Sequence, residues 1–388
     1  MDPLKQQQIS VPTIEVYLAI EEQIFLNVAK CLKKNQSLLT PENIHTWQAQ
    51  QLGLLGALIQ ANIITIAKNS GKAIDEISKA LKEAGYLAAG EFENDLQEAV
   101  RQGKLVEPPG ALENSKSLEN ILSAFQAQAK QTFNMVNTTM LQQSQQAYIN
   151  ILSTTVGKTL TGAQTPFQTM SDAAKQWAEK GIPALVDKAG RQWSTEAYMN
   201  MVVRTLVGNV ANEMQLGRAQ EYGVDLVEVS SHMGSRPSHE PFQGHIFSIS
   251  GKSNKFPPLS KTGYGTPGGL LGINCRHEIF PYIDGVSKKT YHLVDHEKNK
   301  QAYIESQKQR ALERRIRAAK REQMMMEEIG DKEGALKAKQ KVREQQADMR
   351  AFINDTGRTR RYDREQIGLM TKRNAEETYQ QLTSKKRD

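Results

Sequence analysis

The sequence predicts a mainly α-helical protein with one small α+β region and a basic helical tail, and two observations lead to this prediction. Apolar residues recur at intervals of three and four over most of the chain, which is the repeat of one helix face. Only near residues 223–296 do short, partly β-branched runs with a repeat of two appear, between loops rich in glycine and proline.

Several regions are expected, because 388 residues exceed what one hydrophobic core usually holds. Aromatic residues make up only 6% of the chain and charged residues 24%, which favours elongated, solvent-rich parts. We divide the chain into a helical N-terminal region at 1–110, a helical body at 111–222, a small β-containing, Gly/Pro-rich region at 223–296 and a basic helical tail at 297–388.

Helix boundaries are signalled at two places. Thr40-Pro41-Glu42 predicts a helix start, because a threonine hydroxyl caps free N–H groups and proline is tolerated in the first turn. Residues 172–221 are expected to be helical with interruptions near 181–183 and 190, and Gly223 ends the last helix. That helix starts at Ser194 or Thr195, and its apolar stripe is Val203, Val207, Val210 and Met214.

Two further helices are expected from their apolar spacing. A glutamine-rich helix runs from 117 to about 151, with an apolar face of Phe125, Ala129, Phe133, Val136 and Met140. A charged helix runs from Lys298 to about Arg350 with few apolar residues, so it is exposed or packs on another core. Its sparse apolar series is Leu312, Ile316, Met325 and Ile329.

Strands are expected at Leu226–Val229 and Gly244–Ile249, where the apolar repeat is two. The two cysteines, Cys31 and Cys275, are far apart in the chain and suggest no disulfide framework. The first residues lack a basic segment followed by an apolar one, and the apolar run 52–67 is shorter than a membrane span. We therefore expect a protein made in a reducing cytoplasm, with no membrane partner.

The basic excess is confined to the last quarter of the chain. Residues 297–388 hold 24 Lys/Arg and 16 Asp/Glu, whereas residues 1–296 hold 26 and 27. Such asymmetry indicates contact with a polyanion, because Lys and Arg bound to phosphates release counterions; a solvated mixed-charge helix is the alternative. The side chains expected to contact double-stranded DNA are Arg310, Arg314, Arg315, Arg317, Lys320, Arg321, Lys337, Lys339, Lys341 and Arg343.

Residues 230–281 hold four of the seven histidines and one of the two cysteines. Imidazole and thiolate are the usual zinc ligands, and a structural site takes four of them. Zinc is therefore a candidate, although the Cys275-x-His277 spacing is tighter than in familiar zinc modules, and we assign no cofactor from the sequence. The candidate metal ligands are His232, His239, Cys275 and His277, within a motif that also contains Arg236, His245 and Arg276.

Two other interpretations of this motif remain open. The side chains could hydrogen-bond to backbone in a region with too few ladder bonds of its own. A Cys/His pair could also act as nucleophile and base, but no metal-nuclease frame follows, and we expect no enzyme. The nearby glycines are not followed by Lys-Ser/Thr, so they predict a tightly turning loop, not a phosphate cradle. These glycines are Gly263, Gly265, Gly268, Gly269 and Gly272.

An ordered series of short motifs resembles the second minor capsid protein family of siphophages of Gram-positive hosts. The resemblance covers roughly residues 145–355. The motifs are Ser230-Ser231-His232-x-Gly234-x-Arg236-Pro237-Ser238-His239, Gln243-Gly244, Tyr264-Gly265, Gly272-x-Asn274-Cys275-Arg276-His277, Trp177-Ala178-x-Lys180-Gly181-Ile182, Gly190-Arg191-x-Trp193, Tyr198 to Met201 with Val203-Arg204-Thr205, and Gln309 to Lys320.

The resemblance implies a minor structural protein of a tailed-bacteriophage head, more loosely related to Mu-type head-morphogenesis proteins that are present in a few copies near the portal. It implies the portal protein, the major capsid protein and packaged DNA as partners, with a role in assembly, packaging or ejection. It implies no catalytic role for the His/Cys motif. The alternatives are a metal-dependent hydrolase or nuclease carried in the virion, and an internal scaffold protein.

Overall fold

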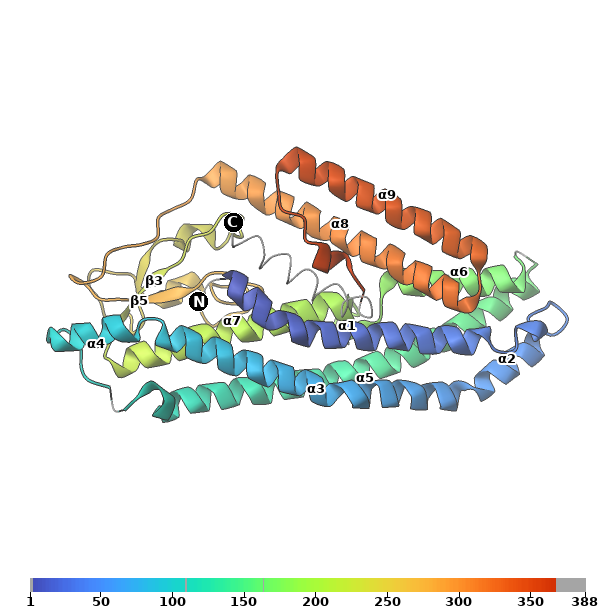
Figure 1. Ribbon diagram of the computed structural model, residues 1–388, viewed down its shortest axis with the longest axis horizontal. Coiled ribbons are helices and arrows are strands. Elements are labelled where there is room, and N and C mark those ends of the chain that lie inside the picture. The colour runs from blue at the N-terminus through green and yellow to red at the C-terminus, as the bar shows by residue number, and fades with distance from the viewer. Residues whose placement is uncertain (1–2, 109, 163, 368–388) are drawn as a thin grey trace, which may run out of the picture. The chain divides into compact units, whose positions relative to one another are not determined.

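The computed structural model describes residues 3–108, 110–162 and 164–367 (Figure 1). The last part of the basic tail, 368–388, lies outside them.

The fold is mainly helical with a small antiparallel sheet, as the sequence predicts. The helices are α1 (Pro3–Lys33), α2 (Ile44–Gly53), α3 (Leu55–Gly90), α4 (Glu93–Arg101), α5 (Lys116–Leu160), α6 (Pro166–Lys180), α7 (Thr195–Glu221), α8 (His296–Ile329) and α9 (Lys332–Thr356), and the strands are β1 (Pro183–Val186), β2 (Gln192–Ser194), β3 (Leu226–Val229), β4 (Ile246–Ser248) and β5 (Ile279–Tyr282).

The chain divides into two compact units, each assembled from segments that are distant in sequence. Each division point falls inside a helix. The four regions expected from the sequence follow chain order and therefore do not coincide with these units. Unit 1 comprises residues 1–14, 74–132 and 200–307, and unit 2 comprises residues 15–73, 133–199 and 308–388.

Among the described residues, no single helix has the length and apolar composition of a membrane span. The bent pair Ile44–Gly53 and Leu55–Arg101, with 41° between its halves, meets that test by length and composition only.

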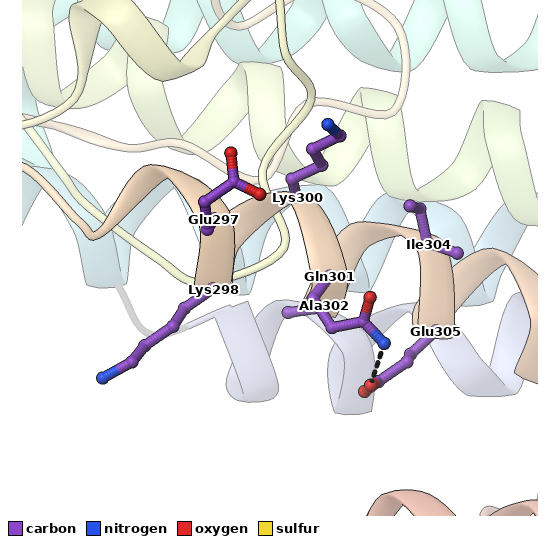
Figure 2. A pocket seen from close by; sticks show the side chains of 7 residues that line it. All are labelled: Glu297, Lys298, Lys300, Gln301, Ala302, Ile304 and Glu305. Carbon is purple, nitrogen blue, oxygen red and sulfur yellow. Dashed lines mark hydrogen bonds between the residues drawn. The ribbon is translucent and has the colours of Figure 1, made fainter.

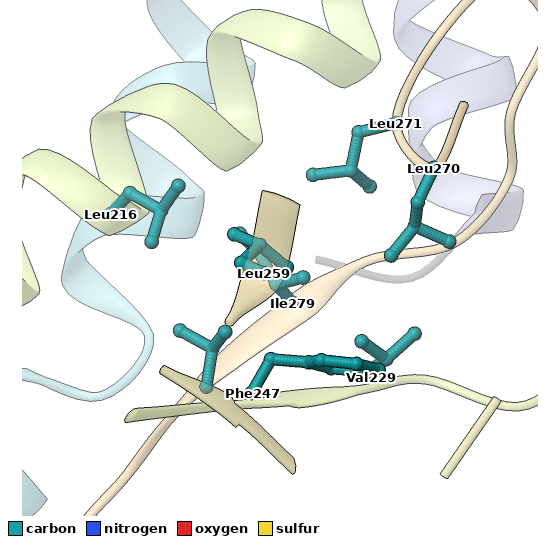
Figure 3. Packing of buried hydrophobic residues seen from close by; sticks show 8 residues of the cluster. Leu216, Val229, Phe247, Leu259, Leu270, Leu271 and Ile279 are labelled. Carbon is teal, nitrogen blue, oxygen red and sulfur yellow. The ribbon is translucent and has the colours of Figure 1, made fainter. Parts of the chain in front are cut away.

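The sheet of unit 1 has the order β4-β3-β5, with both neighbours antiparallel to β3. Its strands are only three or four residues long, so they bury few side chains. Figure 3 shows how the core is completed: Leu216 of α7 and loop leucines surround the strand residues Val229, Phe247 and Ile279. The loop leucines are Leu259, Leu270 and Leu271.

Helix α4 is fixed to the end of α7 by a buried arginine in unit 1. Arg218 is 1% exposed, and its guanidinium donates to Glu93 at 2.9 Å and to Glu221 at 2.6 Å. Tyr222 donates to Glu93 at 2.7 Å. Burial opposes ionisation of Glu93, but the hydrogen bonds from Arg218 and Tyr222 and the Arg218 charge outweigh it and hold the pKa of Glu93 below its usual value. The Arg218 guanidinium thus forms ion pairs with two carboxylates, one from each helix.

The predicted helix α7 and strand β3 are confirmed, and the glutamine-rich helix extends further than predicted, to Leu160. Val203, Val207, Val210 and Met214 are fully buried. The predicted start near Thr40 is wrong, because α2 begins at Ile44. The Thr40 hydroxyl instead accepts the N–H of Asn43 at 3.3 Å and closes a turn before the helix.

In unit 2 the segment 183–194, expected to be interrupted helix, forms the hairpin β1–β2. The Asp187 carboxylate accepts the N–H groups of Ala189 and Arg191, both at 2.9 Å, and Gly190 has φ +77°. This turn returns the chain on itself, which a helix cannot do.

The expected continuous helix from 298 to 350 is also wrong, because it breaks into α8 and α9. Gly330 has φ +92°, a conformation that glycine adopts at little cost. Asp331 then caps α9 by accepting the N–H of Gly334 at 2.8 Å. The two helices are joined by Lys341 of α9, which donates to Glu322 of α8 at 2.9 Å.

The Arg218 cluster gives a stability test. We expect Arg218→Ala to lower the free energy of unfolding by about 1.5–3 kcal/mol, because it removes charged hydrogen bonds made by a buried side chain and leaves the half-buried Glu93 carboxylate without its charge partner. The control is Arg101→Ala, which removes an exposed pair with Glu98 and should cost no more than about 1 kcal/mol. Denaturant unfolding followed by circular dichroism measures both, and equal losses would contradict this role of Arg218.

Candidate functional site

Three segments of unit 1 bring the predicted metal-ligand residues together. His232 lies in the loop after β3, His239 precedes the 3₁₀ turn Glu240–Phe242, and Cys275 and His277 lie in the segment that leads into β5. Ligand atoms of His239, Cys275 and His277 all lie within 4.8 Å of one another. The His232 ring lies against the His277 ring, with 4.5 Å between their centroids.

The cysteine sulfur is the centre of this His/Cys cluster, defined as His232, His239, Cys275 and His277. The Cys275 Sγ atom is 3.5 Å from His239 Nδ1 and 3.3 Å from His277 Nδ1. His239 is 2% exposed and His277 is 3% exposed, whereas His232 and Cys275 are half-buried. The sequence therefore identified side chains that the fold brings within ligand distance of each other.

His239 and His232 each have one ring nitrogen that is hydrogen-bonded to a backbone carbonyl. His239 Nε2 lies 3.0 Å from the carbonyl oxygen of Gly268, and His232 Nδ1 lies 3.2 Å from that of Met233. A carbonyl only accepts, so each of these nitrogens carries the hydrogen. One nitrogen of each of these two rings therefore bonds to backbone, as the second interpretation of the motif expects. The other nitrogen of each neutral ring has no hydrogen and is an acceptor.

Burial governs the electrostatics of the cluster. Burial, with the nearby histidines and Arg236, lowers the pKa of His277 to about 2, and burial lowers the pKa of His232 and of His239. Burial also raises the pKa of the Cys275 thiol. The rings are therefore neutral near pH 7, and the free thiol is not the activated thiolate that nucleophilic catalysis requires.

Two amide side chains hold the loop that carries His232. Gln243, which is fully buried, accepts the N–H of His232 at 2.7 Å and donates to Ser235 Oγ at 3.0 Å. Asn299 of α8 accepts the N–H groups of Gly234 at 2.8 Å and Ser235 at 3.0 Å. The sequence reasoning missed Asn299, because it follows the loop by more than 60 residues and belongs to no motif.

The other motif residues lie around the cluster. Arg236 donates to the carbonyl oxygen of Ile273 at 2.6 Å and so ties the His239 segment to the Cys275 segment. His245 is exposed, with Nδ1 3.0 Å from the Gln243 carbonyl oxygen, and Arg276 is half-buried. These three side chains support or border the cluster and supply none of its grouped ligand atoms.

The glycine-rich loop is a tightly turning backbone, as the sequence predicts. A Cβ atom at Gly269 would lie 1.9 Å from the Gly263 oxygen, and one at Gly272 would lie 2.5 Å from the Thr266 oxygen. Only glycine allows this approach. The loop turns around itself just before Cys275 and positions that residue.

The basic residues predicted to contact DNA all lie in unit 2 and fall into three groups by burial. Arg317 and Arg321 are buried; Arg317 donates to Glu196 at 2.5 Å, and Arg321 donates to the Ala178 carbonyl oxygen at 3.0 Å. These two serve internal packing, and their assignment to a DNA surface is withdrawn. Arg310, Lys320 and Lys341 are half-buried, and Arg314, Arg315, Lys337, Lys339 and Arg343 are exposed.

A hollow along the first turns of α8 is a weaker candidate for a site. Figure 2 shows its lining: the side chains come from one helix, and the hydrogen bond drawn is the 2.8 Å bond from Gln301 to Glu305. Two acids and two lysines line it, so neither sign of charge predominates there. The lining residues are Glu297, Lys298, Lys300, Gln301, Ala302, Ile304 and Glu305.

Comparison with known proteins gives one consistent result. The family model described as "Phage minor capsid protein 2" matches residues 1–354. A structural protein of Lactococcus phage LL-H is 29% identical over 372 residues, covering 90% of this chain and 97% of the relative. A structural protein of Lactococcus phage mv4 is 37% identical over 115 residues, covering 29% of this chain and 93% of the relative. No solved structure matches the chain.

Proposed function

Because the chain belongs to the phage minor capsid protein 2 family, we propose that it acts as a non-enzymatic link between the head proteins and the packaged DNA. The family makes it a minor structural component of the phage head, and the match extends to the N-terminal residues that the sequence motifs did not reach. The proposal adds three points: a place near the portal, contact with DNA and the absence of catalysis.

The exposed basic side chains of α8 and α9 support the DNA contact, and they are the observation that carries the proposal. Residues 297–367 hold 19 Lys/Arg and 13 Asp/Glu, so a positive excess remains within the described residues. Lys339 and Arg343 are four residues apart on α9, which places them on one helix face. Basic side chains on one face can follow a row of phosphates without reading base sequence.

The state of Cys275 supports a role without catalysis. A nucleophilic cysteine needs a lowered pKa and access to substrate. Cys275 has a raised pKa, and its two imidazole neighbours are buried. The geometry of the cluster therefore favours a structural role over a hydrolase or nuclease centre.

The place near the portal is supported by the resemblance to head-morphogenesis proteins. A protein present in few copies must be held by the larger assembly around it, and the portal and the major capsid protein are the two candidates. Both units expose lysines suitable for crosslinking, among them Lys82 of α3 and Lys339 of α9.

Crosslinking of intact heads followed by mass spectrometry tests the location. We expect crosslinks from this chain to the portal protein, with fewer to the major capsid protein. Crosslinks spread evenly over the shell protein, with none to the portal, would refute the portal location while leaving the structural role intact.

Salt-dependent binding to double-stranded DNA tests the DNA contact. The test variant combines Arg315→Gln, Lys339→Gln and Arg343→Gln. We expect the slope of log affinity against log salt to become shallower by about 2–3, because each lost phosphate contact removes about 0.9.

The matched control neutralises three exposed lysines of α3, combining Lys68→Gln, Lys79→Gln and Lys82→Gln. It has the same net charge as the test variant, so the two separate a local surface from overall charge. Equal slopes for both variants, or no DNA binding by the full chain, would contradict the proposed surface.

A further inference from the structure

We propose that the His/Cys cluster is a structural zinc site, in which His239 Nδ1, Cys275 Sγ and His277 Nδ1 are ligands and His232 Nε2 completes the tetrahedron. The ligand atoms of the first three residues are already grouped within 4.8 Å. This assignment goes beyond the role of the protein in the phage head and is independent of the proposed DNA contact.

The measured separations fit a tetrahedral zinc ion. With Zn–S near ~2.3 Å and Zn–N near ~2.0–2.1 Å, the sulfur and nitrogen ligands of a tetrahedral site are about 3.6 Å apart. Cys275 Sγ lies 3.5 Å from His239 Nδ1 and 3.3 Å from His277 Nδ1. These two sulfur–nitrogen separations are close to those between zinc ligands.

Counting hydrogens shows that protein groups alone leave the cluster incompletely satisfied. His239 donates from Nε2 to the Gly268 carbonyl, so its Nδ1 is an acceptor facing the sulfur. The thiol of Cys275 has one hydrogen and faces two Nδ1 atoms. His232 Nε2 and His277 Nε2 are buried without a hydrogen-bond partner, which is costly for polar groups in a protein interior.

A zinc ion removes part of this deficit, because it binds His232 Nε2, while the N–H at His277 Nε2 stays without a protein partner. The ion would take the lone pairs of both Nδ1 atoms and the sulfur, with release of the thiol hydrogen to solvent as a proton. Donation from His239 Nε2 to a backbone carbonyl is the usual support of a metal-bound histidine.

His232 is assigned as the fourth ligand because its Nε2 atom has a lone pair and no hydrogen-bond partner. Its Nδ1 donates to the Met233 carbonyl, which leaves Nε2 with a lone pair. Its ring centroid lies 4.5 Å from that of His277, one of the three grouped ligands.

The donor set selects zinc over magnesium or calcium. Thiolate and imidazole suit zinc, whereas magnesium and calcium require oxygen ligands. Among the described residues the group contains no carboxylate.

The site would act as a crosslink between loops. His239 and Cys275 are separated by 36 residues, and this span contains β4 and the glycine-rich loop. A bound ion would close the span and fix the glycine-rich loop against the His239 segment.

Metal analysis of the purified full chain tests the proposal. We expect one zinc per chain by elemental mass spectrometry after growth in zinc-supplemented medium, and a lower melting temperature after chelation. Replacement by cobalt should give the intense visible bands of a tetrahedral site and a sulfur-to-cobalt charge-transfer band. Substoichiometric zinc together with no cobalt spectrum in the wild-type chain would overturn the proposal.

Variants identify the ligands. We expect Cys275→Ser to abolish the charge-transfer band, and His232→Gln to lower zinc affinity at least about tenfold, near the lower end of losses around metal sites. The controls are Cys31→Ser, which alters the other cysteine, and His245→Gln, which alters an exposed neighbouring histidine; both should retain the ion. Unchanged affinity in His232→Gln would overturn the fourth ligand, and loss of the ion in both controls would overturn the assignment.

Discussion

The small sheet of unit 1 cannot satisfy the backbone around it, and this constraint shapes the whole region 223–296. Its strands have three or four residues, so most N–H groups of the region lie outside any ladder, yet buried N–H groups must be paired. Side chains supply the missing acceptors. Glu228, buried on the central strand, accepts the N–H groups of Thr290 and Tyr291 at 2.9 and 2.6 Å, and Asn212 of α7 accepts that of Ile279 at 3.1 Å.

The same constraint explains where the His/Cys cluster lies. A region held by side-chain acceptors places polar groups in its interior, and these can be brought together at low additional cost. Gln243 and Asn299 fix one side of the cluster, and the glycine-rich loop fixes the other. A region pinned in this way keeps its shape with a small apolar core.

Much of the fold could be predicted from sequence where local signals and packing agree. Helix α7 has a cap, a regular apolar stripe and a terminating glycine, and β3 was placed to the residue. The prediction differs from the structure where a local hydrogen bond or a glycine turn interrupts a segment whose apolar residues have a helical repeat. Asp187 closes the β1–β2 turn, and Gly330 with Asp331 ends α8 and starts α9; both signals are present in the sequence but were overridden by the helical pattern.

The candidate site was predictable in its residue types but not in its geometry. Histidines and a cysteine within some 50 residues indicated a cluster, whereas the approach of His239 to Cys275 depends on the pairing of β3 with β5 and on glycine contacts within a loop. Asn299 could not be found, because its partners are backbone N–H groups, which carry no sequence identity. In the basic tail the residue types alone were misleading, because a count of charges does not distinguish the buried Arg317 from the exposed Arg315.

Amide hydrogen exchange of the full chain, resolved to short peptides, tests most directly whether side-chain acceptors hold the region 223–296 together. We predict slow exchange at His232, Gly234 and Ser235, which lie outside the strands but donate to Gln243 and Asn299. Exchange there as fast as in an unstructured peptide, with protection confined to the strands, would contradict this prediction.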